Sequence, residues 1–382
     1  MFQRKLPFPK SSILLLGPRG TGKSTWIQQN LPNAPSYDLL NTRESLELSK
    51  APSRLFQELE TLPPQTWVVL DEIQKVPALM DEVHRLMEKR SLRFVLCGSS
   101  ARKLKRGGSN LLAGRAQLSE MFPLVSAEVG YKISFDQVCQ QGMLPTAYTS
   151  ADPKSYLRTY TETYLKEEIK AEALTRDIGA FARFLEIAAR QNAQVTNVSN
   201  ISRDAMVARQ TVEGFFEILV DTLTGFWLSP WKLKRATKQK AHPKFYFFDA
   251  GVARALSGRL PYPPTPEESG FLFETFILNE IRAYLSYAQL HYPLFYWSSH
   301  DDVEVDIFLE TRKGFIAIEI KSASRWEKKY HRGFLRLAEE CGIKKMKCYG
   351  IYTGERPLHT DNITIYPFLH FLKKLWEGDL IT

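Results

Sequence analysis

The sequence has few cysteines and no long apolar run. Its four cysteines, at positions 97, 139, 341 and 348, form no C-x-x-C pair and no zinc-binding spacing, which argues against a disulfide framework or a zinc ribbon. No stretch approaches the roughly 18 apolar residues of a membrane helix, and the opening MFQRKLPFPKSS has no apolar signal-peptide core. We therefore expect a soluble, reduced, cytoplasmic protein with no membrane partner.

Composition excludes a largely disordered chain, because 44% of the 382 residues are hydrophobic and 24% are charged. The length favours two or three domains. The formal charge is 51 basic minus 42 acidic residues, or +9. Counted by segment, residues 1–150 carry 19 basic and 13 acidic residues, residues 151–260 carry 17 and 12, and residues 261–382 carry 15 and 17. The basic excess in the first two thirds suggests a polyanionic partner.

The clearest motif follows the apolar run Ile13–Leu16, which is typical of a strand buried on both faces. Immediately after it comes GPRGTGKS, a G-x-x-x-x-G-K-S pattern that leads into a predicted helix. Glycines let backbone N–H groups approach phosphates, the lysine places a charge at the β- and γ-phosphates, and the serine hydroxyl ligates Mg²⁺. The predicted ATP-binding residues here are Gly17, Gly20, Gly22, Lys23, Ser24 and Thr25.

A second buried-strand pattern, WVVLDE, ends in two acids. Asp71 is predicted to hold Mg²⁺ together with Ser24, and Glu72 to polarise the water that attacks the γ-phosphate. An acidic turn after a structural strand is the alternative. A third strand, at 94–97, runs into Gly98-Ser99-Ser100, and either serine could sense the γ-phosphate, with Ser99 preferred.

Basic residues follow this third strand. Four of them fall within 102–106, where the alternatives are a solvated loop and a contact with the DNA backbone. Arg115 is predicted to act on the γ-phosphate, in its own chain or in a neighbouring subunit, and a surface salt bridge is the alternative.

The middle of the chain is predicted to be helical and to contain a winged helix. Two short helices, at 198–206 and 211–219, have helix-turn-helix spacing, and strands are expected at 226–228 and 245–247. A basic run at 232–240 lies between these strands, where a wing would be. DNA binding and protein packing are both uses of this shape, and Glu213 and Glu217 on the second helix would repel phosphates.

A proline-rich linker at 261–266 marks a predicted boundary, and a helix carrying Glu274 follows it. Two strands, at 303–309 and 315–321, are joined by a short turn. Alternation puts Val303, Val305, Ile307 and Leu309 on one face and the acids on the other, so a hairpin would bring Asp306, Glu319 and Lys321 together.

The two carboxylates, with Glu274 as a further ligand, are predicted to bind Mg²⁺ or Mn²⁺, and Lys321 to orient or deprotonate the attacking water. The alternative is that Asp306, Glu319 and Lys321 form the solvent-facing polar side of an edge hairpin and bind no metal. The spacing Asp-x₁₂-Glu-x-Lys is the pattern of PD-(D/E)XK nucleases.

Over nearly its whole length the chain resembles prokaryotic AAA-type ATPases that carry a carboxy-terminal domain of unknown function with a PD-(D/E)XK-like core. The motifs that carry the resemblance are GPRGTGKS, WVVLDE, LCGSS, LAGR, PKFYFFDAGV, GFLFETFILNE, VEVDIFLE and AIEIKS. The resemblance implies a AAA-type ATPase core, a winged-helix domain and a nuclease-like end. It also singles out Lys244 and Asp249 as a functional pair. Where the family tends to have Gly before Glu304, this chain has Asp302-Val303.

Together these observations predict an α/β multidomain protein with a parallel-sheet ATPase at 1–150, a helical and winged-helix domain at 151–261 and a nuclease-like α/β domain at 262–382. The predicted function is ATP-dependent DNA processing with Mg²⁺-dependent phosphodiester cleavage, in a homo-oligomer that could be a hexameric ring. The alternatives are a nucleotide-switched regulator that binds DNA or protein and cuts nothing, and an ATPase whose nuclease fold serves as an assembly platform.

Overall fold

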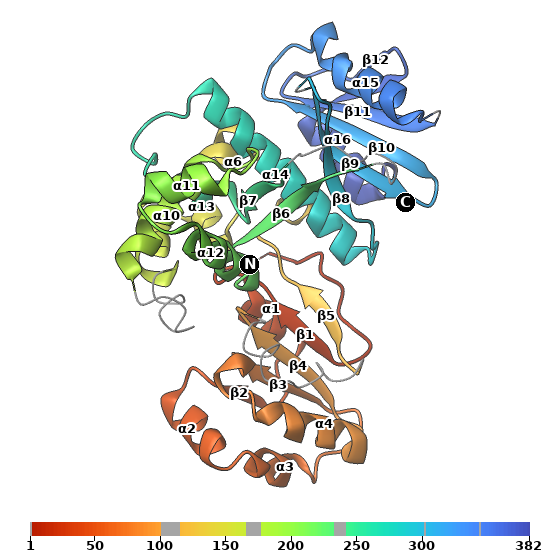
Figure 1. The fold of residues 1–382 in the computed structure, drawn as a ribbon. Helices are drawn as coiled ribbons and strands as arrows, with labels where there is room; N and C mark the ends of the chain where they lie inside the picture. Colours follow the sequence, from red (N-terminus) through yellow and green to blue (C-terminus); the bar gives the residue numbers. More distant parts are fainter. Residues whose placement is uncertain (1, 101–114, 166–176, 233–241, 302, 344) are drawn as a thin grey trace. The chain divides into compact units, whose positions relative to one another are not determined.

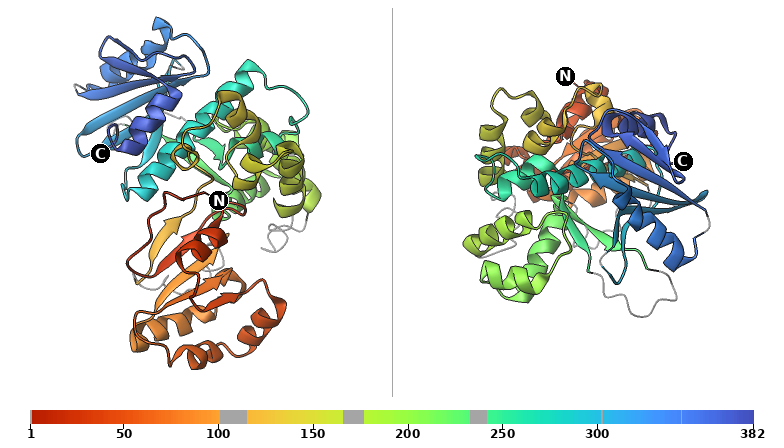
Figure 2. Two further views of the ribbon diagram at one scale, coloured as in Figure 1. Left: turned by 180° about the vertical axis from the view of Figure 1, so that it is seen from behind. Right: turned by 90° about the horizontal axis from the view of Figure 1, so that it is seen from above.

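The computed structural model describes the chain except for residues 1, 101–114, 166–176, 233–241, 302 and 344. The predicted basic contacts at 102–106, and most of those at 232–240, therefore lie outside the described residues. The chain forms two compact units (Figures 1 and 2). The amino-terminal unit comprises Leu6–Pro123 with Asp221–Thr224, and the carboxy-terminal unit comprises Met1–Lys5, Leu124–Val220 and Gly225–Thr382.

The amino-terminal unit contains a five-stranded, wholly parallel sheet in the order β2-β3-β4-β1-β5. The strands are β1 (Ile13–Leu16), β2 (Ser36–Asp38), β3 (Trp67–Asp71), β4 (Arg93–Gly98) and β5 (Gln117–Glu120). The α-helices are α1 (Lys23–Asn30), α2 (Thr42–Lys50), α3 (Ser53–Leu59) and α4 (Leu79–Arg90), and a 3₁₀ turn, η1 (Ile73–Lys75), follows β3.

The middle three strands of this sheet, β1, β3 and β4, were predicted from unbroken apolar runs, and the structure explains the pattern. Val68, Leu70, Phe94 and Leu96 are fully buried, because helices α3 and α4 cover the sheet and share its core. Parallel strands all end at the same edge, so the residues that follow β1, β3 and β4 gather there.

The carboxy-terminal unit begins with helices. These are a 3₁₀ turn η3 (Ser126–Val129), α6 (Phe135–Gln141), α7 (Pro145–Thr149), α8 (Pro153–Thr159), a π-helical turn η4 (Tyr160–Leu165), α10 (Ile178–Arg190), α11 (Val198–Ala205), α12 (Arg209–Asp221) and α13 (Ala250–Leu256). The helix pair predicted at 198–206 and 211–219 is thus present as α11 and α12. The buried face of α12 consists of Val212, Phe215, Phe216, Ile218 and Leu219.

The rest of this unit is an eight-stranded mixed sheet in the order β12-β13-β11-β10-β9-β8-β6-β7. Its strands are β6 (Gly225–Pro230), β7 (Lys244–Phe247), β8 (Leu294–Ser298), β9 (Glu304–Thr311), β10 (Gly314–Lys321), β11 (Met346–Tyr352), β12 (Leu358–Thr360) and β13 (Ile363–Pro367). Its helices are α14 (Pro266–Tyr287), η5 (Lys328–His331), α15 (Arg332–Cys341) and α16 (Phe368–Glu377). Figure 1 shows the long α14 running between the helical part and the sheet, where it packs on α6, α13, α16 and β10.

The expected boundary near residue 262 does not separate two packed bodies. Strand β6 pairs antiparallel with β7 and parallel with β8, through Ser229 beside Phe295 and Pro230 beside Tyr296. One hydrophobic core also extends from Leu124 to Ile381. The segments 151–261 and 262–382 therefore share one sheet and one core.

The alternation predicted for β9 breaks at one point. Ile307 and Leu309 belong to the main core, as expected, but Val305 packs with Phe308 in a smaller core on the α15 side. The β8–β9 register shifts between Phe295 and Trp297, and this irregularity changes which side chains share a face. The prediction that Val305 and Ile307 share a face was therefore wrong.

Candidate functional site

The predicted P-loop joins β1 to α1. Gly20 and Gly22 have φ of 77° and 92°, a left-handed conformation that favours glycine. Lys23 is buried, and its Nζ donates to the carbonyl oxygens of Gly17 at 2.7 Å and Pro18 at 3.1 Å. The loop is thus a backbone cradle with one buried ammonium group, as a phosphate-binding loop requires.

The predicted magnesium-binding residues lie together at the carboxyl edge of the sheet. Ser24, exposed in the first turn of α1, donates through Oγ to Oδ2 of Asp71, at the end of β3, over 3.0 Å. A hydroxyl and a carboxylate in contact beside a phosphate-binding loop are a suitable donor set for Mg²⁺. Thr25 follows on the exposed side of the helix.

Glu72 is buried and has a positive φ of 58°, so its backbone turns sharply as β3 ends. Its Oε2 accepts a short hydrogen bond from Nε2 of Gln74 and lies 3.4 Å from Oγ of Ser99. The same Gln74 amide nitrogen lies 3.2 Å from Ser99 Oγ. Ser99 and the buried Ser100 were both candidates, and Ser99 is the one in contact with Glu72.

Gln74 was missed by the sequence analysis. Its signal was Gly98: a Cβ atom at this position would lie 2.3 Å from Oε1 of Gln74, so the glycine leaves room for the amide. The sequence shows that Gly98 precedes Ser99 and Ser100, but a glycine before two serines does not indicate which distant side chain packs against it. The three side chains of Glu72, Gln74 and Ser99 form a buried polar network.

Arg115 is not close to the P-loop. It precedes β5, whereas the P-loop follows the parallel β1, so the two lie at opposite edges of the sheet. Its guanidinium contacts His84 and lies 2.7 Å from Oε1 of Glu88, both on α4. The placement gives no support to action on its own chain's nucleotide, and action in a neighbouring subunit stays a prediction.

The carboxy-terminal unit brings the predicted nuclease residues together. The β9–β10 ladder ends at Ile307 opposite Ile318, and beyond it Asp306 Oδ2 accepts the backbone N–H of Ile320 at 2.6 Å. Lys321 Nζ lies 2.6 Å from Oε1 of Glu319 and 3.8 Å from Oδ2 of Asp306. The hairpin thus joins these three charged side chains.

A second lysine enters the same cluster. Lys244, at the start of β7, is buried, and its Nζ lies 2.9 Å from Oε2 of Glu304 and 3.5 Å from Oε1 of Glu274. Tyr246 donates its hydroxyl to the same Glu274 oxygen. We call the six charged residues the carboxylate cluster; they are Lys244, Glu274, Glu304, Asp306, Glu319 and Lys321.

Burial shapes the protonation of the cluster. Desolvation, followed by the repulsion of Asp306, raises the pKa of Glu319 to about 8 against the attraction of Lys321. Desolvation also raises the pKa of Glu274 to about 7, although the Lys244 ammonium opposes it. For Lys244, burial opposes the charge, but the nearby carboxylates of Glu274, Glu304 and Asp306 raise its pKa above the ordinary value. The lysines are therefore charged near neutral pH.

No group of three or more His, Cys, Asp or Glu side chains in the described part of the chain is arranged to hold a metal ion. A cation at the carboxylate cluster would have to displace the protons that burial favours on Glu274 and Glu319. With all groups ionised, the four carboxylates and two ammonium groups would leave a charge of −2, which a divalent cation would neutralise. The buried Oε2 of Glu319 also has no hydrogen-bond partner.

Lys244 and Asp249, singled out as a pair, have separate roles. Asp249 is buried and caps α13 by accepting the N–H of Val252 at 2.9 Å, and it also accepts the N–H of Met143 at 2.6 Å. Gly251 lies close to the backbone of Gln141, where a Cβ would be 2.3 Å from a carbonyl oxygen. Asp249 therefore joins two loops, whereas Lys244 belongs to the carboxylate cluster.

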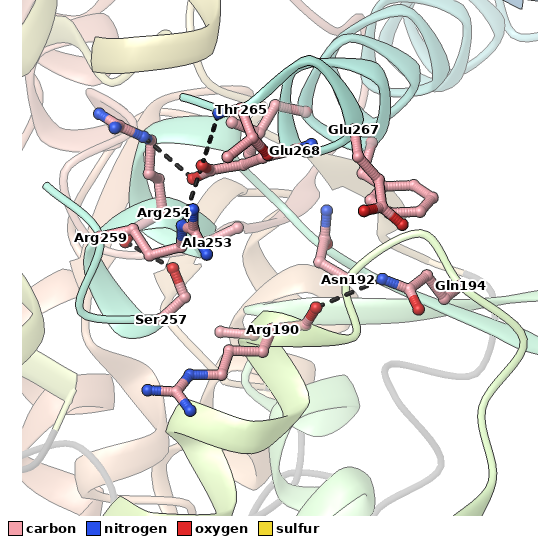
Figure 3. Close-up of a pocket in the computed structure, with 13 residues that line it drawn as sticks. Arg190, Asn192, Gln194, Ala253, Arg254, Ser257, Arg259, Thr265, Glu267 and Glu268 are labelled. Carbon is pink, nitrogen blue, oxygen red and sulfur yellow. Dashed lines mark hydrogen bonds and ion pairs between the residues drawn. The ribbon is translucent and has the colours of Figure 1, made fainter. Parts of the chain in front are cut away.

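A separate cavity of about 200 Å³ lies beside the start of α14 (Figure 3). Glu268 bridges two arginines there, with Oε1 at 3.1 Å from Nε of Arg254 and Oε2 at 3.0 Å from Nε of Arg259. Arg254 is fully buried, and its carbonyl accepts the hydroxyl of Ser257. This network connects α13 and the loop after it to the first turn of α14, across the proline-rich linker.

Comparison with protein families divides the chain into three parts. Residues 9–130 match a AAA domain family, residues 132–262 match a domain of unknown function (DUF8612), and residues 269–371 match another domain of unknown function (DUF4143). Uncharacterized proteins of Mycobacterium bovis and Mycobacterium tuberculosis are each 27% identical over 322 residues, which is 82% of this chain and 70% of theirs.

Similarity to solved structures is weak. The ORC1 protein of Aeropyrum pernix, solved in complex with DNA, covers 66% of this chain and 88% of its own with 13% identity and a TM-score of 0.31. Can2 from Sulfobacillus thermosulfidooxidans, solved in complex with cyclic tetra-adenylate, covers 97% and 100% with 11% identity and a TM-score of 0.23. No conclusion rests on likenesses at this level.

No helix in the described ranges is both long enough and apolar enough to cross a membrane. The family match at residues 9–130 coincides with the parallel sheet, the P-loop and the acidic end of β3. The amino-terminal unit of this chain is therefore supported, by sequence and by geometry, as a P-loop ATPase domain of the AAA type.

Proposed function

We propose that this protein hydrolyses ATP at its P-loop and cleaves phosphodiester bonds of DNA at the carboxylate cluster. The proposal of phosphodiester cleavage rests on one observation. Helix α14 and strands β9 and β10 bring together the side chains of Glu274, Asp306, Glu319 and Lys321. The unpartnered Oε2 of Glu319 supports it, because a buried acceptor without a donor calls for a ligand.

At the ATPase site, Lys23 would bind the phosphates, Ser24 and Asp71 would hold Mg²⁺, and Glu72 would accept the proton of the attacking water. At the carboxylate cluster, Glu274, Asp306 and Glu319 would hold Mg²⁺ or Mn²⁺. A metal held there would lower the pKa of a bound water and stabilise negative charge on the phosphate. Lys321, whose Nζ lies 2.6 Å from Glu319, would orient that water or move its proton.

The middle segment is proposed to be a winged-helix domain that binds DNA. Helices α10, α11 and α12 are followed by the antiparallel pair β6–β7, and Val195 forms a bridge with Lys244. This order of helices and strands supports the assignment. Arg209 is paired with Glu213 at 3.0 Å, which reduces the basic character of α12.

A cleavage assay tests the nuclease proposal. Wild type, Asp306→Asn and the matched variant Glu310→Gln, which lies exposed on the same β9 strand, are incubated with branched, duplex and single-stranded DNA, with Mg²⁺ or Mn²⁺. We expect cleavage by wild type and Glu310→Gln and a loss of at least 100-fold in Asp306→Asn. Equal rates for wild type and Asp306→Asn would refute the proposal.

A second candidate is a nucleotide-switched regulator that binds DNA or a protein without cutting it. The buried Lys244, in contact with Glu274 and Glu304, favours it, because an internal ammonium group neutralises the carboxylates that a metal needs. In that case Lys23→Ala alters binding of the partner, whereas Glu319→Gln and Lys321→Met leave it unchanged. The third possibility is an ATPase whose nuclease-like fold serves only as an assembly platform, and it is tested by measuring the mass of the protein with and without ATP.

A further inference from the structure

The segment that follows β10 carries four exposed basic residues shortly after Lys321 of the carboxylate cluster. We define the basic segment as residues 325–332, which contain Arg325, Lys328, Lys329 and Arg332, all exposed. Lys329 is paired with Glu327 at 2.8 Å. The other three have no ion-pair partner among the residues that the structure describes, so their charges are available to a ligand.

The basic segment is held in place by the half-buried Trp326 and the buried His331. Nε1 of Trp326 donates to Nε2 of the buried His331 at 2.9 Å. Trp326 also packs over Gly350, where a Cβ would lie 2.6 Å from the indole ring. These contacts anchor the segment between its exposed cations, and a preorganised group of charges suits a polyanion.

Two contacts place the basic segment next to the carboxylate cluster. Nζ of Lys321 lies 5.7 Å from the centre of the Tyr330 ring. The start of α15 packs against the backbone of Glu304, because a Cβ on Gly333 would lie 2.3 Å from its carbonyl oxygen. The basic segment and the carboxylate cluster are therefore neighbours at Tyr330 and Gly333.

We propose that the basic segment binds the phosphate backbone of a nucleic-acid strand and guides it to the carboxylate cluster, with Arg325, Lys328 and Arg332 as the phosphate contacts. The inference rests on the proposed function for the identity of the cluster. A nucleic acid fits better than an acidic protein, because a row of cations beside carboxylates and a lysine matches a chain of phosphodiesters that must reach the cluster.

The test compares two triple variants of equal charge. The first is Arg325→Ala, Lys328→Ala and Arg332→Ala. The control is Arg312→Ala, Lys313→Ala and Lys345→Ala, three exposed cations at the other end of the β9–β10 hairpin. Binding of fluorescein-labelled 30-nucleotide single-stranded and duplex DNA is measured in EDTA between 50 and 200 mM salt.

We expect the first triple variant to lower the slope of log K against log salt by about 2 to 3, because each lost phosphate contact contributes about 0.7 to 0.9. The control should keep the wild-type slope. An unchanged slope in the first variant, or an equal change in the control, would overturn the proposal. So would loss of binding to anionic lipid vesicles in the first variant with DNA binding unchanged.

The outcome separates this inference from the proposed function. If the wild type cuts no DNA but the first triple variant shows a smaller slope of log K against log salt, the phosphate-binding role of the basic segment is supported and the nuclease activity is refuted. Cleavage by wild type with an unchanged slope in the first triple variant would support the nuclease and refute the surface. Circular dichroism of both triple variants checks that each folds like wild type.

Discussion

Ser24 and Asp71 are joined by a hydrogen bond of 3.0 Å that links the start of α1 to the end of β3. The two residues are 47 positions apart, yet the parallel sheet brings them to one edge. Their contact makes them one functional group rather than two. We expect Ser24→Ala and Asp71→Asn each to lower ATP turnover by about 100-fold, and the double variant to be no worse than the poorer single one. Steady-state hydrolysis with Mg²⁺ checks this, and multiplied losses would contradict it.

Gln74 is expected to restrain Glu72. Its amide donates to Oε2 of Glu72 and so occupies the oxygen atom that would otherwise be available to polarise a water. We predict that Gln74→Ala raises basal kcat for ATP several-fold with little change in KM. Gly98→Ala should have the same effect, because its Cβ displaces the Gln74 amide. Binding of a fluorescent ATP analogue should be unchanged in both variants. A fall in kcat would mean that Gln74 positions Glu72 for catalysis.

Lys244 is expected to compete with metal. Lys244→Met removes one ammonium group and leaves four carboxylates with Lys321 alone. We predict a lower melting temperature in EDTA, by several degrees, and recovery on addition of Mn²⁺. Calorimetry should show Mn²⁺ binding about ten-fold tighter than in wild type. Weaker Mn²⁺ binding would show instead that Lys244 orients the ligands.

Glu280 should make stability depend on pH. It accepts hydrogen bonds from Ser126 and from Nε1 of Trp376 at 2.7 Å, but burial raises its pKa to about 7 despite them. The folded state then holds a proton that the unfolded state releases near pH 4.5, so this contribution is full below 4.5 and is lost as pH rises through 7.

Urea denaturation at pH 5 and pH 8 measures the effect of Glu280. We expect the wild type to lose on the order of 1–3 kcal/mol of unfolding free energy from this group between the two values. In Glu280→Gln, which cannot ionise, that part of the difference should vanish. A pH dependence identical to that of wild type would contradict the shifted pKa.

Arg115 is expected to act between subunits, because Glu88 and the sheet edge keep it from its own P-loop. Arg115→Ala and Lys23→Ala should each abolish ATP hydrolysis. Mixing the two variants should restore a fraction of it, since some interfaces then pair an intact arginine with an intact P-loop. No recovery on mixing, with oligomers present by mass, would count against action in trans.

The sequence predicted local elements well, because their signals are local. The P-loop, the buried strands around Val69 and Leu96, and the hairpin with Asp306 and Glu319 all follow from motif and alternation. It predicted poorly what depends on distant pairing. Lys244 lies 30 residues before Glu274, and only the folding of β7 beside α14 brings their charges together.

Two further features could not be predicted for physical reasons. The break in alternation at Val305 comes from an extra residue in β9: Phe295 and Trp297 are two positions apart in β8, but their partners Phe308 and Val305 are three apart. An irregularity of this kind is defined by the pairing with β8, and the alternating sequence of β9 does not show it. Gln74 looked like a residue of an ordinary turn, because its partner Ser99 comes 25 residues later. In both cases the decisive partner lies outside the local sequence pattern.

The pairing of β6 with β8 has a consequence for how this protein could have been assembled from parts. A strand from the segment matching DUF8612 is hydrogen-bonded into the sheet of the segment matching DUF4143, and Lys244 of the first neutralises carboxylates of the second. Exchange of either segment alone between proteins would leave an open strand edge and an uncompensated buried charge. The two segments should therefore be inherited together, as one recombination unit.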